Sequence, residues 1–196
     1  MKKILLISFA SLFLFCGKEN VIKIGAAGPM TGDQAKMGQD IAHGVALAIN
    51  EWNARGGIPG KKIVVVIGDD RRDPREAVSV ANKMVNEQVV GVVGHFNSSC
   101  SIPASKIYNE YGVIQITPAS TNPQLTEQGF ETVFRVCGRD DQQGIVGAKF
   151  VLEKLKKTQI AVLHDKTTYG QGLADEFKRN IEIDKSATIV AYESII

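Results

Sequence analysis

The sequence predicts an α/β fold built around a parallel β-sheet, and three observations lead to that prediction. Short β-branched apolar runs alternate with segments whose apolar residues recur every three or four positions, which are the spacings of strands and helices. The run KIVVVIG at 62–68 is apolar without a break, as in a strand buried on both faces. The connections between these segments are short. Such a βαβ rhythm specifies parallel strands joined by right-handed crossovers.

The first series of elements starts at residue 21. Gly56 and Gly57 end its first helix, because glycine adopts the left-handed cap conformation at little cost. Asp73 is expected to cap the second helix, with Pro74 in its first position and Glu76 completing a capping box. In chain order, we expect a strand at 21–24, a helix over 41–52, a strand at 62–68, a helix from residue 73, a strand at 89–94, a helix at 101–110, a strand at 113–117 and a short extended segment at 133–136.

A second α/β series follows a segment rich in Pro, Thr, Asn and Gln. It should contain a helix at 140–157, a strand at 159–163, a loop at 164–172, a helix to about residue 180 and a strand at 187–196. The chain is thus expected to form a first lobe over 20–135 and the start of a second over 136–196. Because it stops inside an apolar strand, we expect a truncated chain that is unstable in isolation.

The first fifteen residues have the pattern of an export signal. Lys2 and Lys3 precede an apolar run of about 12 residues, which is too short to span a bilayer. The run ends in Leu-Phe-Leu-Phe before Cys16, which resembles a lipoprotein signal with Cys16 as the lipidated residue. The alternative is a plain secretory leader. Either way the expected location is the periplasm or cell envelope, with a lipid anchor at Cys16 in the first case.

Candidate binding groups lie in the loops at the carboxyl ends of the expected strands, where open parallel sheets bind ligands. Ser98 and Ser99 stand before a helix, so their hydroxyls and the free backbone N–H groups can bind an anion. Ala119, Ser120 and Thr121 offer a carbonyl and hydroxyls. One loop suits a carboxylate and the other an ammonium, which together describe an α-amino acid. The alternative is that Ser98 or Ser99 is only an N-cap.

Other functional classes find little support in the sequence. The formal net charge of +2 falls to zero without the two leader lysines, so nucleic acid is not an expected partner. The dinucleotide fingerprint, the P-loop and the G-x-S-x-G elbow are all absent, and neither a catalytic set nor a cofactor is expected. We therefore expect a binding protein and not an enzyme.

The remaining polar residues are expected to have structural roles. The three histidines are scattered along the chain, and Asp69 with Asp70 is expected to form a solvated turn and a cap, not a cation site. Cys100 and Cys137 show no disulfide-framework spacing and no zinc-site neighbours, so two separately buried thiols are expected.

Three strand-end motifs in order carry a family resemblance: GHFNSS at 94–99, ITPASTNP at 116–123 and HDKTTYGQG at 164–172. With them the chain resembles the periplasmic leucine/isoleucine/valine-binding proteins of ABC transporters, from about residue 21 to its end. The resemblance implies the type I periplasmic binding fold, in which two doubly wound lobes close on a ligand. It also implies an ABC permease in the inner membrane as partner and a branched-chain amino acid as ligand.

The resemblance assigns roles to individual residues. It implies that Ser98 binds the ligand carboxylate, and that Ala119 and Thr121 hold the ammonium and carboxylate. Tyr169 of the second lobe closes over the ligand. Phe96 and Met37 line the cleft, with Asn97 at its rim. Amide- or urea-binding proteins and the ligand-sensing domains of receptors share this fold and remain alternative functions.

Overall fold

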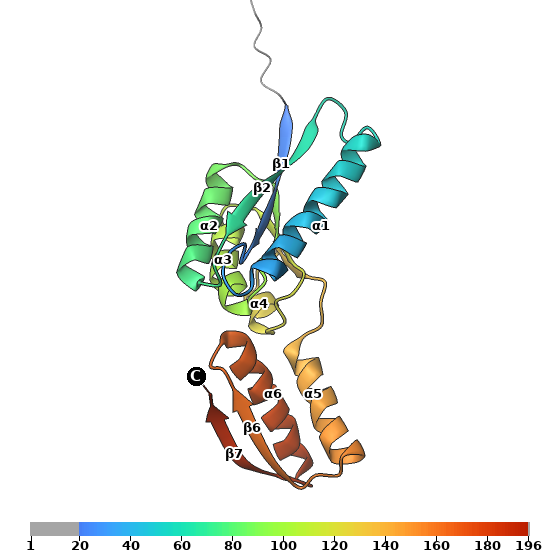
Figure 1. The fold of residues 1–196 in the computed structure, drawn as a ribbon, viewed down its shortest axis with the longest axis vertical. Coiled ribbons are helices and arrows are strands. Elements are labelled where there is room, and N and C mark those ends of the chain that lie inside the picture. The colour runs from blue at the N-terminus through green and yellow to red at the C-terminus, as the bar shows by residue number, and fades with distance from the viewer. Residues whose placement is uncertain (1–19, 196) are drawn as a thin grey trace, which may run out of the picture.

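The computed structural model describes residues 20–195 and contains two parallel sheets with helices packed on them (Figure 1). The expected export signal and the lipidated Cys16 lie outside the described residues. The predicted α/β fold with parallel strands is confirmed.

The first sheet has five parallel strands in the order β2-β1-β3-β4-β5. The strands are β1 (Val21–Gly28), β2 (Lys62–Asp69), β3 (Gly91–Val93), β4 (Ile114–Thr117) and β5 (Val133–Arg135). Because strand order reverses direction at β1 and β3, the loops at their carboxyl ends diverge and leave a crevice between them. The candidate binding loops follow β3 and its neighbour β4, at the same carboxyl edge of the sheet.

The helices cover both faces of this sheet. α2 (Pro74–Asn86) and α3 (Ser98–Glu110) pack together on one side, whereas α1 (Ala35–Ala54) covers β1 and β2 on the other (Figure 1). The short α4 (Gln124–Glu127) follows β4. The larger core lies under α2 and α3, where Met84, Val92, Cys100 and Tyr108 are buried together. The Cys100 thiol is free, and burial raises its pKa to about 12.

The second group of elements follows β5 and forms a separate layer pair below the first sheet (Figure 1). α5 (Asp140–Lys149) ends in a π-helical turn (Phe150–Lys154), and α6 (Thr168–Asp184) packs against it beside the parallel pair β6 (Gln159–His164) and β7 (Thr188–Ser194). A Cβ at Gly144 would lie only 2.7 Å from Cβ of Glu176. Glycine at this position therefore allows α5 and α6 to approach closely.

Several predicted boundaries differ from the structure. α3 begins at Ser98 instead of residue 101, and the α-helical part of α5 ends at Lys149 instead of residue 157. The expected loop at 164–172 is wrong beyond residue 167, because α6 begins at Thr168. Only one half of the predicted capping box forms. The Asp73 side chain caps α2, but the Asp73 backbone N–H donates to the carbonyl of Asp70 and not to Glu76.

The cap of α2 supports a first test. The Asp73 carboxylate accepts hydrogen bonds from the backbone N–H groups of Arg75 and Glu76, at 2.7 and 3.1 Å. We expect Asp73→Ala to lower the free energy of unfolding by about 1 kcal/mol, because these two donors lose their acceptor. Asp73→Asn keeps a capping oxygen and should stay within a few tenths of a kcal/mol of the original. Urea denaturation monitored by circular dichroism measures both, and equal losses in the two variants would contradict the capping role.

Candidate functional site

Six of the seven sequence-predicted binding residues surround one small cavity between the first sheet and α5–α6. The cavity has a volume of about 240 Å³. Typical pockets for drug-sized ligands measure roughly 300–1,000 Å³, so this one suits a smaller molecule. Its lining consists of Phe96, Asn97, Ser98, Ala119, Thr121, Gln143 and Tyr169.

The first wall is the serine loop, residues 94–98, which leads from β3 into α3. Asn97 is the N-cap of α3, and the first intrahelical hydrogen bonds are those that Cys100 and Ser101 donate to its carbonyl. The N–H groups that precede them lie at the positive end of the helix, the usual donors to an anion. Ser98 is the first helical residue, so the alternative of Ser98 or Ser99 as N-cap is wrong.

The second wall is the threonine loop, residues 117–123, which follows β4. Several of its carbonyl oxygens accept hydrogen bonds. Those of Ser120 and Asn122 accept from the Arg135 guanidinium, and that of Thr121 accepts from the Asp140 N–H. The Ala119 carbonyl accepts no hydrogen bond from the described residues. It is therefore available to a ligand donor.

Two polar groups of these walls are placed for binding. The Thr121 hydroxyl oxygen is buried and makes no hydrogen bond within residues 20–195. The Ser98 side chain is 2% exposed and accepts the Asn122 N–H at 3.3 Å, which leaves its own proton to donate. A buried polar atom without a partner is costly, and a ligand that supplies the partner gains from it.

The third wall comes from the second group of elements. Tyr169 lies in the first turn of α6, and this turn is joined to the threonine loop because the Asn122 amide donates to the Thr168 carbonyl at 2.9 Å. Gln143 of α5 also lines the cavity, and its amide donates to the Asp140 carboxylate at 3.1 Å. Burial raises the pKa of Asp140, whose Oδ2, like the Thr121 hydroxyl, is buried without a hydrogen-bond partner among residues 20–195.

Met37 is the one predicted residue outside this cavity. It lines an adjoining pocket of about 490 Å³ beside α1, which shares Phe96 and Ala119 with the cavity. Its side chain is 47% exposed. The role that the resemblance gives to Met37 in the cleft thus stays a prediction.

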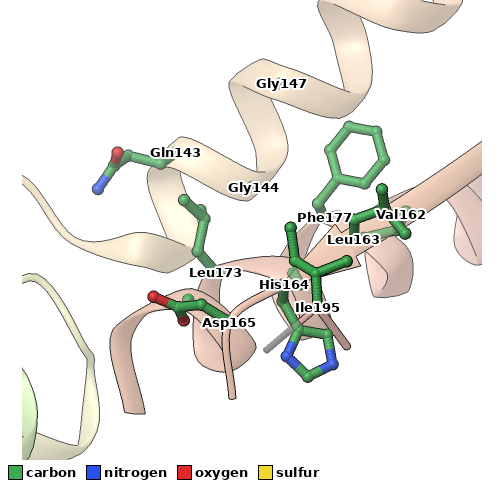
Figure 2. Close-up of a pocket in the computed structure, with 12 residues that line it drawn as sticks. Gln143, Gly144, Gly147, Val162, Leu163, His164, Asp165, Leu173, Phe177 and Ile195 are labelled. Atoms are coloured by element: carbon green, nitrogen blue, oxygen red, sulfur yellow. The ribbon is translucent and has the colours of Figure 1, made fainter. Parts of the chain in front are cut away.

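A larger pocket, of about 560 Å³, lies between α5, β6 and α6 (Figure 2). Its walls are mainly apolar, and Figure 2 shows the Gln143 amide pointing away from Val162 and Phe177 at the other end. Its other polar side chains, His164 and Asp165, accept hydrogen bonds from the next residues of their own loop, whereas the smaller cavity has a buried hydroxyl that is open to a ligand. We therefore place the candidate site in the smaller cavity.

Sequence reasoning missed Gln143 and Asn122. Nothing in the sequence distinguishes Gln143 from its neighbour Gln142, because only the phase of α5 decides which one faces the cavity. Asn122 belongs to the ITPASTNP motif, which was a signal for its importance, but the contact with Thr168 depends on tertiary structure.

The acidic pair at the carboxyl end of β2, Asp69 and Asp70, departs from the expected solvated turn. Asp70 is fully buried and lies 2.6 Å from the ring of His95, which is also fully buried. Asp69 accepts hydrogen bonds from Met30 and Thr31, and so fastens the loop after β1. The structural role expected for His95 is thus confirmed.

The seven side chains that line the cavity carry no formal charge. Among residues 20–195, no three His, Cys, Asp or Glu side chains cluster as metal ligands would. In the same part of the chain, no helix has the length and apolar character needed to cross a membrane. Cys100 and Cys137 are both free thiols, as expected, although Cys137 is only half-buried.

Comparisons with known proteins agree with the fold and the site motifs. Residues 21–190 match the family described as periplasmic binding protein. The Leu/Ile/Val-binding protein homolog 1 of Brucella abortus is 49% identical over 175 residues, which are 89% of this chain and 47% of that protein. An amino acid binding protein of Pseudomonas aeruginosa is 52% identical over 155 residues, 79% of this chain and 41% of that protein. The chain thus spans about half the length of the curated relatives it matches.

Solved structures of binding proteins also superimpose on this chain. A leucine-binding protein of Thermotoga maritima superimposes with a TM-score of 0.78 at 29% identity, over 89% of this chain and 48% of that one. The branched-chain amino acid transporter substrate-binding protein of Streptococcus pneumoniae, solved with isoleucine, gives a TM-score of 0.79 at 32% identity. That match covers 90% of this chain and 50% of the other.

Proposed function

Because this chain belongs to the periplasmic binding protein family, we propose that it captures a branched-chain or similar aliphatic amino acid for an ABC transporter. The observation that carries the proposal is the small uncharged cavity with anion-binding groups on one wall and a free carbonyl on another. The relatives' names agree with this ligand class.

The cavity geometry favours a zwitterion. The ligand carboxylate meets the amino end of α3 and the Ser98 hydroxyl, and the ammonium meets the Ala119 carbonyl and Thr121. Charge-assisted hydrogen bonds of this kind contribute about 1.5–3 kcal/mol each. A ligand with net charge would find no compensating side chain among the seven lining residues, whereas a zwitterion needs none.

Phe96 and Tyr169 supply the apolar part of the cavity. Apolar walls distinguish ligands by only about 1–3 kcal/mol per methylene. Leucine, isoleucine and valine should therefore compete for the site. The adjoining pocket beside Met37 extends the apolar surface from Phe96 and Ala119.

The proposal extends to the rest of the molecule. We assign the first lobe to residues 20–135 and the start of the second to 136–196, with the cavity between them. The protein acts by binding and release and not by catalysis, in the periplasm or cell envelope, with Cys16 as lipid anchor. An ABC permease of the inner membrane receives the ligand.

A second candidate is an amide or urea ligand. The uncharged lining favours it as well, because a neutral amide can accept from Ser98 and donate to the Ala119 carbonyl. It would leave the positive end of α3 without an anion, which makes the amino acid the better match.

Isothermal titration of the full-length natural protein tests the proposal. We expect tight binding of leucine, isoleucine and valine, and binding at least a hundred-fold weaker for glutamate, acetamide and urea. Preferential binding of acetamide or urea would replace the first candidate with the second. No heat from any of these compounds would contradict both.

The two adjacent serines provide a matched pair of variants. Ser98→Ala should weaken leucine binding about ten-fold, because one charge-assisted hydrogen bond of about 1.5 kcal/mol is lost. Ser99→Ala should bind leucine unchanged, since Ser99 does not line the cavity. Equal effects of the two substitutions on the leucine dissociation constant would remove Ser98 from the site.

A further inference from the structure

Next to the cavity-lining Phe96 in the sequence, His95 joins two other buried polar side chains in a chain of hydrogen bonds, and none of the three lines the cavity. The His95 ring lies between Asp70 and Tyr108, with Nδ1 at 2.6 Å from Asp70 Oδ2 and Nε2 at 3.1 Å from the Tyr108 hydroxyl. All three side chains are fully buried. Burying polar side chains costs free energy, so the complete burial of all three requires an explanation.

The partners fix the ring in one orientation. Burial and the nearby Asp70 carboxylate raise the pKa of Tyr108, so the phenol keeps its proton. In the tautomer with the proton on Nδ1, that N–H donates to the Asp70 carboxylate, which can only accept, and the phenol donates to Nε2. Asp70 is itself held, because its second oxygen accepts the Arg72 N–H at 2.9 Å. The ring of His95 therefore cannot rotate without losing a hydrogen bond at each nitrogen.

The backbone of the same residue joins the serine loop to the threonine loop. The hydroxyls of Ser101, Thr117 and Ser120 lie 3.2, 2.9 and 3.3 Å from the His95 carbonyl oxygen. The Thr117 hydroxyl in turn accepts the N–H groups of Ala119 and Ser120, at 3.3 and 2.9 Å. The His95 carbonyl thus joins three hydroxyls of the two loops, beside the bond from the Asn122 N–H to the Ser98 hydroxyl, and helps to set where Ala119 lies relative to Ser98.

We propose that His95 is a positioning residue for ligand binding: Asp70 and Tyr108 hold its ring so that its carbonyl keeps the serine loop and the threonine loop at the separation that the ligand requires. This inference rests on the proposed function for its binding readout, but the loop geometry can be measured without a ligand. His95 itself touches no ligand, since it does not line the cavity.

Two substitutions of His95 distinguish its hydrogen bond to Asp70 from its hydrogen bond to Tyr108. Asparagine places an amide nitrogen near the position of Nδ1, so His95→Asn keeps a donor to Asp70. Glutamine places its amide near Nε2, so His95→Gln leaves the Asp70 carboxylate without that donor. In the full-length natural protein, we expect leucine affinity to fall ten-fold or more in His95→Gln and at most three-fold in His95→Asn.

A control variant distinguishes positioning from general loss of stability. Cys100 lies in the same buried cluster as Tyr108 but joins neither loop through its side chain. Cys100→Ala should lower the melting temperature while the leucine dissociation constant stays within two-fold of the original. If His95→Gln does not fold, Tyr108→Phe serves in its place, with an expected three-fold loss of affinity.

Hydrogen exchange without ligand gives the independent readout. We expect the amides of Ala119 and Ser120 to exchange at least ten-fold faster in His95→Gln, or in Tyr108→Phe, than in Cys100→Ala. If these amides exchange faster in the variant but the unsubstituted protein binds no amino acid, the proposed ligand class is refuted and the positioning role is still supported. Exchange of these amides at the rate of the Cys100→Ala variant would overturn the positioning role.

Discussion

Gly94→Ala is expected to lower the free energy of unfolding by about 3 kcal/mol, since it combines steric overlap with an unfavourable backbone conformation. A Cβ at this position would lie 2.2 Å from the carbonyl oxygen of Ala27 on β1. The backbone φ of Gly94 is +144°, which L-residues rarely adopt. Its N–H donates to Ile116 and its carbonyl accepts from Gln115, so it cannot move without loss of both bonds.

Gly112 provides the control for this substitution. Its φ is +68°, but a Cβ there would have open space around it. Gly112→Ala should therefore cost only about 1 kcal/mol, the price of the left-handed conformation alone. Urea denaturation curves of both variants measure the difference. If the two substitutions cost the same, close packing against β1 is not the reason for glycine at position 94.

Hydrophobic periodicity was sufficient to predict the elements of this fold, but not where each one starts. Strands and helices appear in the predicted order because burial on a parallel sheet demands apolar runs and stripes. The sequence predicts a loop at 164–172, yet α6 begins at Thr168 and contains Gly170 and Gly172. A Cβ at Gly170 would lie 2.1 Å from Asp165, and one at Gly172 would lie 2.5 Å from Asn122. These glycines serve close packing, which leaves no periodic signal.

The candidate site is likewise only partly predictable from the sequence. The loop motifs identified Ser98, Ala119 and Thr121, because short polar segments after buried strands must gather at one edge of the sheet. The partners of these residues are set by tertiary contacts between distant segments. Asp70 was expected in a solvated turn, yet it is buried against His95, which is 25 residues further along the chain. No local pattern predicts such a pair.

Thr121→Val should have opposite effects on stability and on binding. Valine has nearly the shape of threonine but lacks the hydroxyl, which is buried without a hydrogen-bond partner among the described residues. Removing an unsatisfied buried polar group is neutral or favourable, so the free energy of unfolding without ligand should stay the same or rise by up to about 1 kcal/mol.

Leucine binding by the same variant should weaken by about thirty-fold, because a charge-assisted hydrogen bond of about 2 kcal/mol is lost. Urea denaturation and isothermal titration of the full-length natural protein measure the two effects. Thr132→Val is the matched control, since the Thr132 hydroxyl donates to the Asn109 side chain outside the cavity and its loss should affect stability and not leucine affinity. A Thr121→Val protein that is less stable yet binds leucine normally would show that the hydroxyl serves the fold. Loss of affinity without loss of stability is the result expected if the fold leaves that hydroxyl unpaired and the ligand supplies its partner.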